Sequence, residues 1–187
     1  MRLFIAVELS ESIKKSLLAI QEQLAGLALA IRWSKWEQMH LTLKFLGEVP
    51  DDQVELVCQT TKTLAQQAQP FQMELTRCGC FPRRGDVRVV QMGVRDPASN
   101  LGRCRDLCED SFEKLGFGRE HRPFTPHLTI GRVRRAQAAG RLRVAVDEMI
   151  PSAESQRVDA IFVVRSELAP AGACYSNISR HELGEQT

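Results

Sequence analysis

Residues 40 to 43 read His-Leu-Thr-Leu, and residues 127 to 130 read His-Leu-Thr-Ile. The chain holds only four histidines among its 187 residues, so a histidine followed two positions later by a threonine should be rare. Two copies have a probability of about 0.01 by chance, and the matching apolar residues lower it further. This repeated motif is therefore the most informative feature of the sequence.

The spacing within the motif has a direct structural meaning. In a β-strand, residues two positions apart project from the same face, so each histidine shares a face with the threonine that follows it. The apolar residues of each motif then point into a core on the opposite face. If the two strands face each other, His40, Thr42, His127 and Thr129 line one cleft.

Two imidazoles across a cleft suit phosphodiester chemistry. An unperturbed histidine titrates near pH 6.5, so one imidazole can accept a proton from water or a hydroxyl while the other donates a proton to the leaving oxygen. The threonine hydroxyls can hold the non-bridging phosphate oxygens. Such a scheme needs no metal and no cofactor. The motif spacing does not distinguish the acid from the base, and a lone histidine on a strand is more often structural, as we expect for His121 and His181.

The remaining pattern indicates an α+β fold with antiparallel strands and outer helices. Each half contains a strand, a long helix and a strand that starts with histidine, which favours an internal duplication, with two similar lobes in one compact unit over residues 1–187. Strands are expected at residues 3–7, 40–46, 71–81, 87–94, 127–133, 158–168 and 174–183. Helices are expected after residues 10, 52 and 97, and residues 137–151 are ambiguous, with a short helix as one interpretation.

Composition narrows the class of protein. Hydrophobic residues make up 43% and charged residues 26% of the chain, which is typical of a folded domain. We expect a cytoplasmic protein, because no apolar run resembles a signal peptide or a membrane span, and we expect it to be a monomer. The net charge of +2 is too small to attract nucleic acid by itself, so such attraction requires a local patch.

Such a patch surrounds the second motif. Residues 119–143 contain seven arginines and a single acidic residue, Glu120, a balance that suits an RNA backbone or, alternatively, an ordinary solvated face. Lys44 falls on the His40 face by strict alternation and is a candidate phosphate contact. Phe124 and Trp33 are candidates to stack on a base, with burial in the core as the alternative for each.

Six cysteines raise the question of metal. Cys78 and Cys80 lie two positions apart, and Cys104 and Cys108 have helical spacing. Structural zinc sites usually place two to four residues between paired cysteines, so we interpret these four as reduced, mostly buried thiols and keep zinc binding as the alternative.

The motifs and their surroundings resemble a known family. The stretches that carry the likeness are Arg32-Trp33, His40-Leu-Thr-Leu-Lys-Phe-Leu-Gly-Glu-Val49, Phe124-Thr-Pro-His-Leu-Thr-Ile-Gly-Arg132 and the opening Arg2-Leu-Phe-Ile-Ala-Val7. They are similar to the two-histidine (2H) phosphoesterases, and more narrowly to the bacterial and archaeal RNA 2′,3′-cyclic phosphodiesterases, historically called 2′-5′ RNA ligases. The resemblance runs to about residue 135 and is only general beyond it.

The resemblance implies a bilobal α+β fold with a pseudo-two-fold axis and a central cleft that holds both motifs. It also implies an activity and residue roles. It implies metal-independent hydrolysis of an RNA 2′,3′-cyclic phosphate to a 2′-phosphomonoester, with His40 as proton donor and His127 as proton acceptor. Arg132 matches an arginine of the family pattern and is the best phosphate-side candidate, although strict alternation points it away from the cleft unless a bulge intervenes. The alternatives are 2′-5′ phosphodiester hydrolysis or ligation, a catalytically idle RNA-binding module, and a metal-binding protein built on the cysteines.

Overall fold

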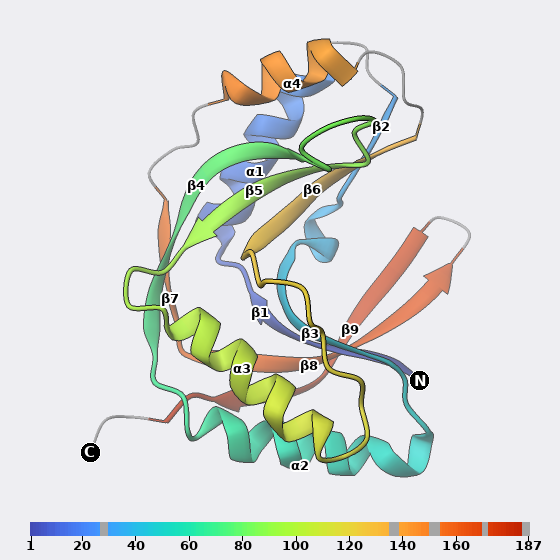
Figure 1. The fold of residues 1–187 in the computed structure, drawn as a ribbon, viewed down its shortest axis with the longest axis vertical. Helices are drawn as coiled ribbons and strands as arrows, with labels where there is room; N and C mark the ends of the chain where they lie inside the picture. Colours follow the sequence, from blue (N-terminus) through green and yellow to red (C-terminus); the bar gives the residue numbers. More distant parts are fainter. Residues whose placement is uncertain (27–29, 135–138, 150–153, 170–171, 185–187) are drawn as a thin grey trace.

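Two antiparallel sheets form the frame of the molecule in a computed structural model, which describes residues 1–26, 30–134, 139–149, 154–169 and 172–184 (Figure 1). The strands are β1 (Arg2–Glu8), β2 (Ile31–Trp33), β3 (His40–Glu48), β4 (Phe71–Phe81), β5 (Val89–Arg95), β6 (His127–Val133), β7 (Ser155–Val158), β8 (Ala160–Ala169) and β9 (Gly172–Glu182). The helices are α1 (Glu11–Ala25), α2 (Val54–Ala65), α3 (Asn100–Glu113) and α4 (Ala139–Asp147), with the 3₁₀ turns η1 (Trp36–Gln38) and η2 (Asp51–Gln53).

The strand orders reveal the duplication that the sequence suggested. The first sheet has the order β3-β1-β8-β9, and the second has the order β2-β6-β5-β4-β7. A strand, a helix and a histidine strand occur once as β1-α1-β3 and again as β5-α3-β6, with the histidine strand beside the first strand each time. The predicted α+β class is therefore confirmed.

Most expected elements are present; in addition, the structure assigns a helix to the ambiguous stretch and contains one strand that was not expected. Residues 137–151, which were ambiguous in the sequence, contain the short helix α4. Residues 137–138 and 150–151 of that range lie outside the described part of the chain. Strand β7 was not expected; it has four residues, too few for a reliable alternation pattern. In the described residues, no helix is long and apolar enough to cross a membrane.

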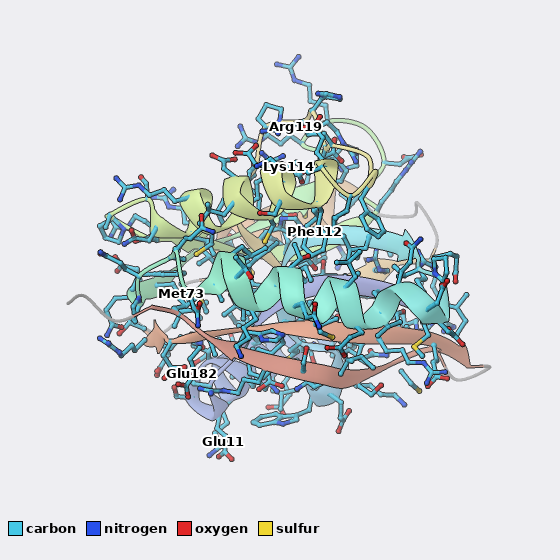
Figure 2. All side chains as sticks on the ribbon, turned by 90° about the horizontal axis from the view of Figure 1, so that it is seen from below. Glu11, Met73, Phe112, Lys114, Arg119 and Glu182 are labelled. Atoms are coloured by element: carbon cyan, nitrogen blue, oxygen red, sulfur yellow. The ribbon has the colours of Figure 1, made fainter. Side chains whose placement is uncertain are left out.

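A single large core lies between the helices and the inner faces of the sheets. Ser10 caps the N-terminus of helix α1, and its side chain accepts a hydrogen bond from the Ile13 backbone. The helix buries Ile13, Leu17, Ile20 and Leu24 on one face. Helix α2 packs on β8 and β9 and against α3, as Figure 2 shows from below. The opposite face of the first sheet carries only a small apolar cluster of Phe4, Ala6, Ala160, Phe162 and Val164.

Each histidine strand contains a β-bulge at the same place. In β3, Thr42 pairs with Ala6 and Lys44 pairs with Ile5, so Leu43 is an extra residue without a register partner. In β6, Ile130 is the extra residue in the pairing with β5. Both bulges fall three residues after the histidine. Because each bulge inserts one residue, it reverses the alternation of the residues that follow it. In β3 this holds as far as a second register shift at Leu46.

The bulge in β3 overturns the expectation for Lys44. The side chain lies on the core face, is 1% exposed, and its Nζ atom is 2.6 Å from Oε2 of Glu109 on α3. It also donates to the Gly118 carbonyl at 2.8 Å. The prediction that Lys44 shares the His40 face and contacts phosphate is wrong, because it assumed strict alternation through a strand that bulges at Leu43.

The second histidine strand is held by a helix in a similar way. Gln21 of α1 is buried, and its Nε2 atom donates to the Ile130 and Ser34 carbonyls at 2.9 Å each. The carbonyl at the bulge in β6 is thereby satisfied. Helix α1 comes from the β1-α1-β3 unit and α3 from the β5-α3-β6 unit, so each unit's helix supports the other unit's histidine strand.

Variants of the buried Lys44–Glu109 pair should lose different amounts of stability. Glu109→Leu leaves the Lys44 ammonium buried without its carboxylate, and a broken buried pair costs about 3–5 kcal/mol. Lys44→Met should cost less, since Glu109 keeps Arg105 at 3.7 Å and the Glu120 backbone N–H at 3.1 Å. The double variant should recover part of the Glu109→Leu loss. Urea unfolding measures all three, with Lys15→Met in the exposed Lys15–Glu11 pair as a control that changes little. Equal effects of Glu109→Leu and Lys15→Met would contradict this assignment.

Candidate active site

The two motif histidines lie on strands of different sheets that contact each other, although 87 positions separate them in the sequence. Strands β3 and β6 approach each other where the two sheets meet (Figure 1). We call the face that carries the histidine and threonine of each motif the motif face of that sheet. His40 is half-buried on the motif face of the first sheet, and His127 is exposed on that of the second.

Each imidazole is oriented by the backbone two residues before it. Nδ1 of His127 lies 2.8 Å from the Thr125 carbonyl, and His40 forms a hydrogen bond with the backbone of Gln38. With Nδ1 donating to a carbonyl, Nε2 of a neutral His127 carries the lone pair and is free to accept a proton. The backbone thus sets the tautomer that a general base requires.

The threonines are placed by the same strands. Thr42 Oγ1 is 3.1 Å from His40 Nε2, so hydroxyl and imidazole form one unit. On the other strand, the Ser34 hydroxyl donates to the Thr129 carbonyl at 2.9 Å and fixes the backbone there. Both threonine side chains are half-buried. Each motif therefore presents an imidazole and a hydroxyl on a backbone held by hydrogen bonds.

An aromatic cluster surrounds His40, whereas no aromatic ring among the described residues stacks on His127. The ring centroid of His40 is 4.7 Å from that of Phe4 and 5.0 Å from that of Tyr175 on β9. A pocket of about 260 Å³ adjoins this cluster and is lined in part by His40, Tyr175, Trp36 and Asn177. The two otherwise similar histidines thus have different surroundings.

The bulges place one further residue on each motif face. Arg132 pairs with Val89, and Thr129 pairs with Gln91, so the bulge at Ile130 returns Arg132 to the His127 face. The equivalent residue of β3 is Phe45, which pairs with Phe4 and is 68% exposed. The residue five positions after each motif histidine is thus a cation in one sheet and an exposed aromatic in the other.

Comparison with known proteins places the chain in a family. A family model described as LigT like phosphoesterase matches residues 7–90. A protein from Methanothermobacter thermautotrophicus, named RNA 2′,3′-cyclic phosphodiesterase, is 32% identical over 97% of this chain and 98% of its own length. The chain belongs to the LigT-like, or two-histidine, phosphoesterases.

Solved structures of similar proteins agree with this phosphoesterase fold. A Thermus thermophilus structure superposes with a TM-score of 0.87 at 26% identity and covers all of both chains. The E. coli LigT structure in complex with 3′-AMP superposes with a TM-score of 0.76 at 26% identity and covers 97% of each chain.

The surroundings of His40 change the acidity of this phosphoesterase residue. Burial lowers the pKa of His40 from 6.5 to about 4; the hydrogen bond with the Gln38 backbone opposes the shift, and the positive charge of Lys14 adds to it. Phe4 and Tyr175 supply much of that burial, because their rings cover the imidazole. His40 is therefore neutral at pH 7 in the free protein.

The arginines around the second motif differ in their partners and in their exposure. Arg119, labelled on the outer side of α3 in Figure 2, is paired with Asp110 and Glu113. Arg122 is paired with Glu120. Arg143 on α4 donates to two carbonyls of the β4–β5 turn. Arg132, Arg134 and Arg141 remain exposed, and Arg135 lies outside the described residues.

The two aromatic candidates from the sequence are less accessible than Phe45. Trp33 packs over Gly131, where an added Cβ would lie 2.8 Å from the indole ring. Phe124 is half-buried against the core, with the Arg105 guanidinium 5.8 Å from its ring centroid. This packing favours structural roles for both. Phe45 and Tyr175 were missed by sequence reasoning; only the assumption of matching bulges would have placed Phe45 on the motif face.

The cysteines lie away from the motif faces of the phosphoesterase. Burial raises the pKa of Cys78 and of Cys104 to about 12, so both thiols are protonated at neutral pH. Within the described part of the chain, no three His, Cys, Asp or Glu side chains gather closely enough to hold a metal ion.

The acidity of His40 should respond to its aromatic cover. Tyr175→Ala exposes the imidazole, so we expect its pKa to rise from about 4 towards 6.5. Tyr175→Phe keeps the ring and should leave the pKa low, because burial rather than the hydroxyl lowers it. NMR titration of the His40 ring protons measures both. A pKa near 4 in Tyr175→Ala would show that Tyr175 is not the cause.

Proposed function

We propose that this phosphoesterase hydrolyses the 2′,3′-cyclic phosphate at the 3′ end of RNA to a 2′-phosphomonoester, with His40 as the acid and His127 as the base. The observation that carries the proposal is the matched presentation of two histidine–threonine pairs by bulged strands at the junction of the two sheets. The name of the Methanothermobacter relative supports cyclic phosphate hydrolysis as the reaction class.

His127 is suited to activate water. Its exposed imidazole directs Nδ1 to the Thr125 carbonyl, which leaves the Nε2 lone pair to take a proton from water as the water oxygen attacks phosphorus. The attack opens the cyclic ester by breaking the bond from phosphorus to the 3′ oxygen. The 2′ oxygen keeps the phosphoryl group.

His40 completes the reaction by protonating the departing 3′ oxygen. The imidazole is neutral in the free protein, so it must gain a proton when substrate binds. A phosphate anion beside Nε2 favours the charged form and raises the pKa of His40 in the complex. The protonation of His40 is thereby coupled to the arrival of substrate. After the reaction, His127 carries the extra proton and His40 is neutral, and exchange with water restores both.

The threonine hydroxyls and the Arg132 guanidinium complete the phosphate site. Thr42 and Thr129 donate to the non-bridging oxygens, where charge concentrates in the transition state. Arg132 lies on the His127 motif face and adds positive charge. The two imidazoles provide both proton transfers, so the proposed mechanism needs no metal ion.

The first test is the reaction itself. The purified protein should convert a cyclic-phosphate-ended oligonucleotide to a 2′-phosphate end at the same rate with and without EDTA. His40→Ala and His127→Ala should each lower turnover by at least about 100-fold, the usual scale of acid–base contributions. His121→Ala should leave the rate unchanged, because His121 is an exposed residue outside both motifs. Absence of a 2′-phosphate product under conditions where a known cyclic phosphodiesterase works would refute the proposal.

A second test separates the two roles. A substrate whose 3′ bridging oxygen is replaced by sulfur has a leaving group that needs no acid. Loss of His40 should then matter little, so His40→Ala should approach the parent rate on this substrate. His127→Ala should stay slow on it, because water still requires a base. Rescue of His127→Ala instead of His40→Ala would reverse the assignment.

A further inference from the structure

One end of the β8–β9 hairpin extends beyond the rest of the first sheet. Strand β1 pairs with β8 only as far as Arg165, whereas the pairing of β8 with β9 continues to Ala169 and Gly172. We call residues 166–169 and 172–176 the arm, which diverges from β1 and β3 in Figure 1. Among the described strands, each half of the arm pairs only with the other half. Because an isolated two-stranded hairpin is barely stable, the position of the arm depends on its contacts with other elements.

The arm carries the aromatic ring that covers His40. Tyr175 pairs with Ser166 within the arm, and its ring centroid is 5.0 Å from that of His40. Phe4, the other ring beside His40, belongs to β1, which lies between β3 and β8, so the sheet itself fixes Phe4. Tyr175 keeps its place over the imidazole only while the arm keeps its own.

One side chain of η1 holds the arm beside Tyr175. Nε2 of Gln38 donates to the Ala173 carbonyl at 2.5 Å, and Oε1 of the same amide accepts from the Lys35 backbone N–H at 3.0 Å. A carbonyl needs a donor and an N–H needs an acceptor, so only one orientation of the amide satisfies both groups. The Gln38 amide therefore anchors the arm two residues before the ring that covers His40.

A second contact steadies the end of the arm. Gly172 has a φ of +123° and lies against the Arg32 guanidinium of β2. An added Cβ at this glycine would be 1.5 Å from Nη2 of Arg32, so the two residues are closely packed. The arm thus reaches from the first sheet to β2 of the second, with Gln38 as the contact nearer to Tyr175.

The residue that anchors the arm also contacts the imidazole. The backbone of Gln38 forms a hydrogen bond with His40, in the way that the Thr125 backbone holds His127. Gln38 thereby joins two supports of one histidine. Its backbone orients the His40 ring, and its side chain fixes the arm whose tyrosine covers that ring.

We infer that Gln38 is a positioning residue for His40, which acts by holding the arm so that Tyr175 stays packed against the imidazole. This inference rests on the proposed function, because it assigns a support to the acid of that reaction. With Phe4 and Tyr175 on its faces, the imidazole keeps Nε2 beside the Thr42 hydroxyl. Release of the arm gives the ring room to turn, and a displacement of about 1 Å in an active site can lower a rate by about 100-fold.

A purely local role for Gln38 would be to cap η1, since Oε1 accepts from Lys35. Two variants separate the roles. Gln38→Met removes both side-chain hydrogen bonds without adding charge. Gln38→Glu keeps an acceptor for Lys35 but loses the donor to Ala173. Gln67→Met is the matched control, because Gln67 is an exposed glutamine whose Nε2 donates to the Thr63 carbonyl at 3.3 Å.

NMR measures the coupling without substrate. In the parent protein, the ring protons of Tyr175 and His40 should show a nuclear Overhauser effect, since the ring centroids are 5.0 Å apart. Gln38→Met and Gln38→Glu should both weaken this effect at pH 7, because each releases the arm. Gln67→Met should leave it unchanged.

The acidity of His40 gives a second readout that a cap of η1 would not change. Gln38→Met should raise the pKa of His40 from about 4 towards 6.5, because the imidazole gains contact with water. The charged side chains that line the pocket beside His40 are Glu8 of β1, Lys14 of α1 and Glu37 of η1. All three are retained in Gln38→Met, so the shift reports the loss of cover.

Turnover should show that Gln38 acts through Tyr175. Gln38→Met should lower kcat on a cyclic-phosphate-ended oligonucleotide by about tenfold, within the range expected for a misplaced catalytic group. In a Tyr175→Ala background, the same substitution should lower kcat by less than about twofold, because the arm then carries no ring over His40. Gln67→Met should keep the parent rate in either background.

The outcomes separate this inference from the function on which it rests. A parent that turns over substrate, with Gln38 variants that keep the Overhauser effect and the low pKa of His40, overturns the inference alone. Loss of the effect in Gln38→Met but not in Gln38→Glu also overturns it, because capping of η1 is then sufficient. Equal losses of kcat with and without Tyr175 overturn it as well. A parent without turnover removes the proposed function and with it the catalytic role of Gln38, whatever the NMR result.

Discussion

The extra residue three positions after each motif histidine governs which side chains lie on the two motif faces. The bulges at Leu43 and Ile130 separate each strand into a part that presents histidine and threonine and a part with the opposite alternation. After the bulge, the next residue points into the core and the one after it returns to the motif face. Lys44 and Gly131 take the inner places, while Phe45 and Arg132 take the outer ones. Without the bulges these inner and outer residues would be exchanged.

Contacts on the core side of the two bulges connect the two halves of the molecule. Lys44 joins β3 to α3 through Glu109, and Gln21 joins α1 to the bulge carbonyl of β6. Glu109 also accepts from the Glu120 backbone, in the segment that leads to the second motif. Each histidine strand thus rests on the helix of the opposite unit. Such cross-support suits the catalytic roles proposed for His40 and His127, because small displacements in an active site cost large factors in rate.

The near-symmetry of the fold is broken by the environment of the histidines. His40 lies beneath Phe4 and Tyr175 with a lowered pKa, and His127 is exposed with Nδ1 directed to a carbonyl. Two matching motifs thus hold imidazoles that differ in burial and in hydrogen-bond partners. Tyr175 comes from β9, in the part of the chain where the family resemblance had become only general. The asymmetry of the site therefore originates outside the motifs.

The sequence by itself determined the α+β class and the duplication and singled out the four motif residues, because periodicity and repetition can be recognised in the sequence without the fold. It also indicated that Arg132 needs a bulge to reach the His127 face, yet it placed Lys44 on the wrong face by assuming none in β3. Only the tertiary structure decided where alternation breaks, since a bulge depends on the partner strand and on what fills the space beneath it. Strand pairing within each sheet likewise decided that Phe45, Tyr175 and Phe81 lie on the motif faces. Sequence reasoning could not find them, because an exposed aromatic residue and a buried one look the same in a sequence.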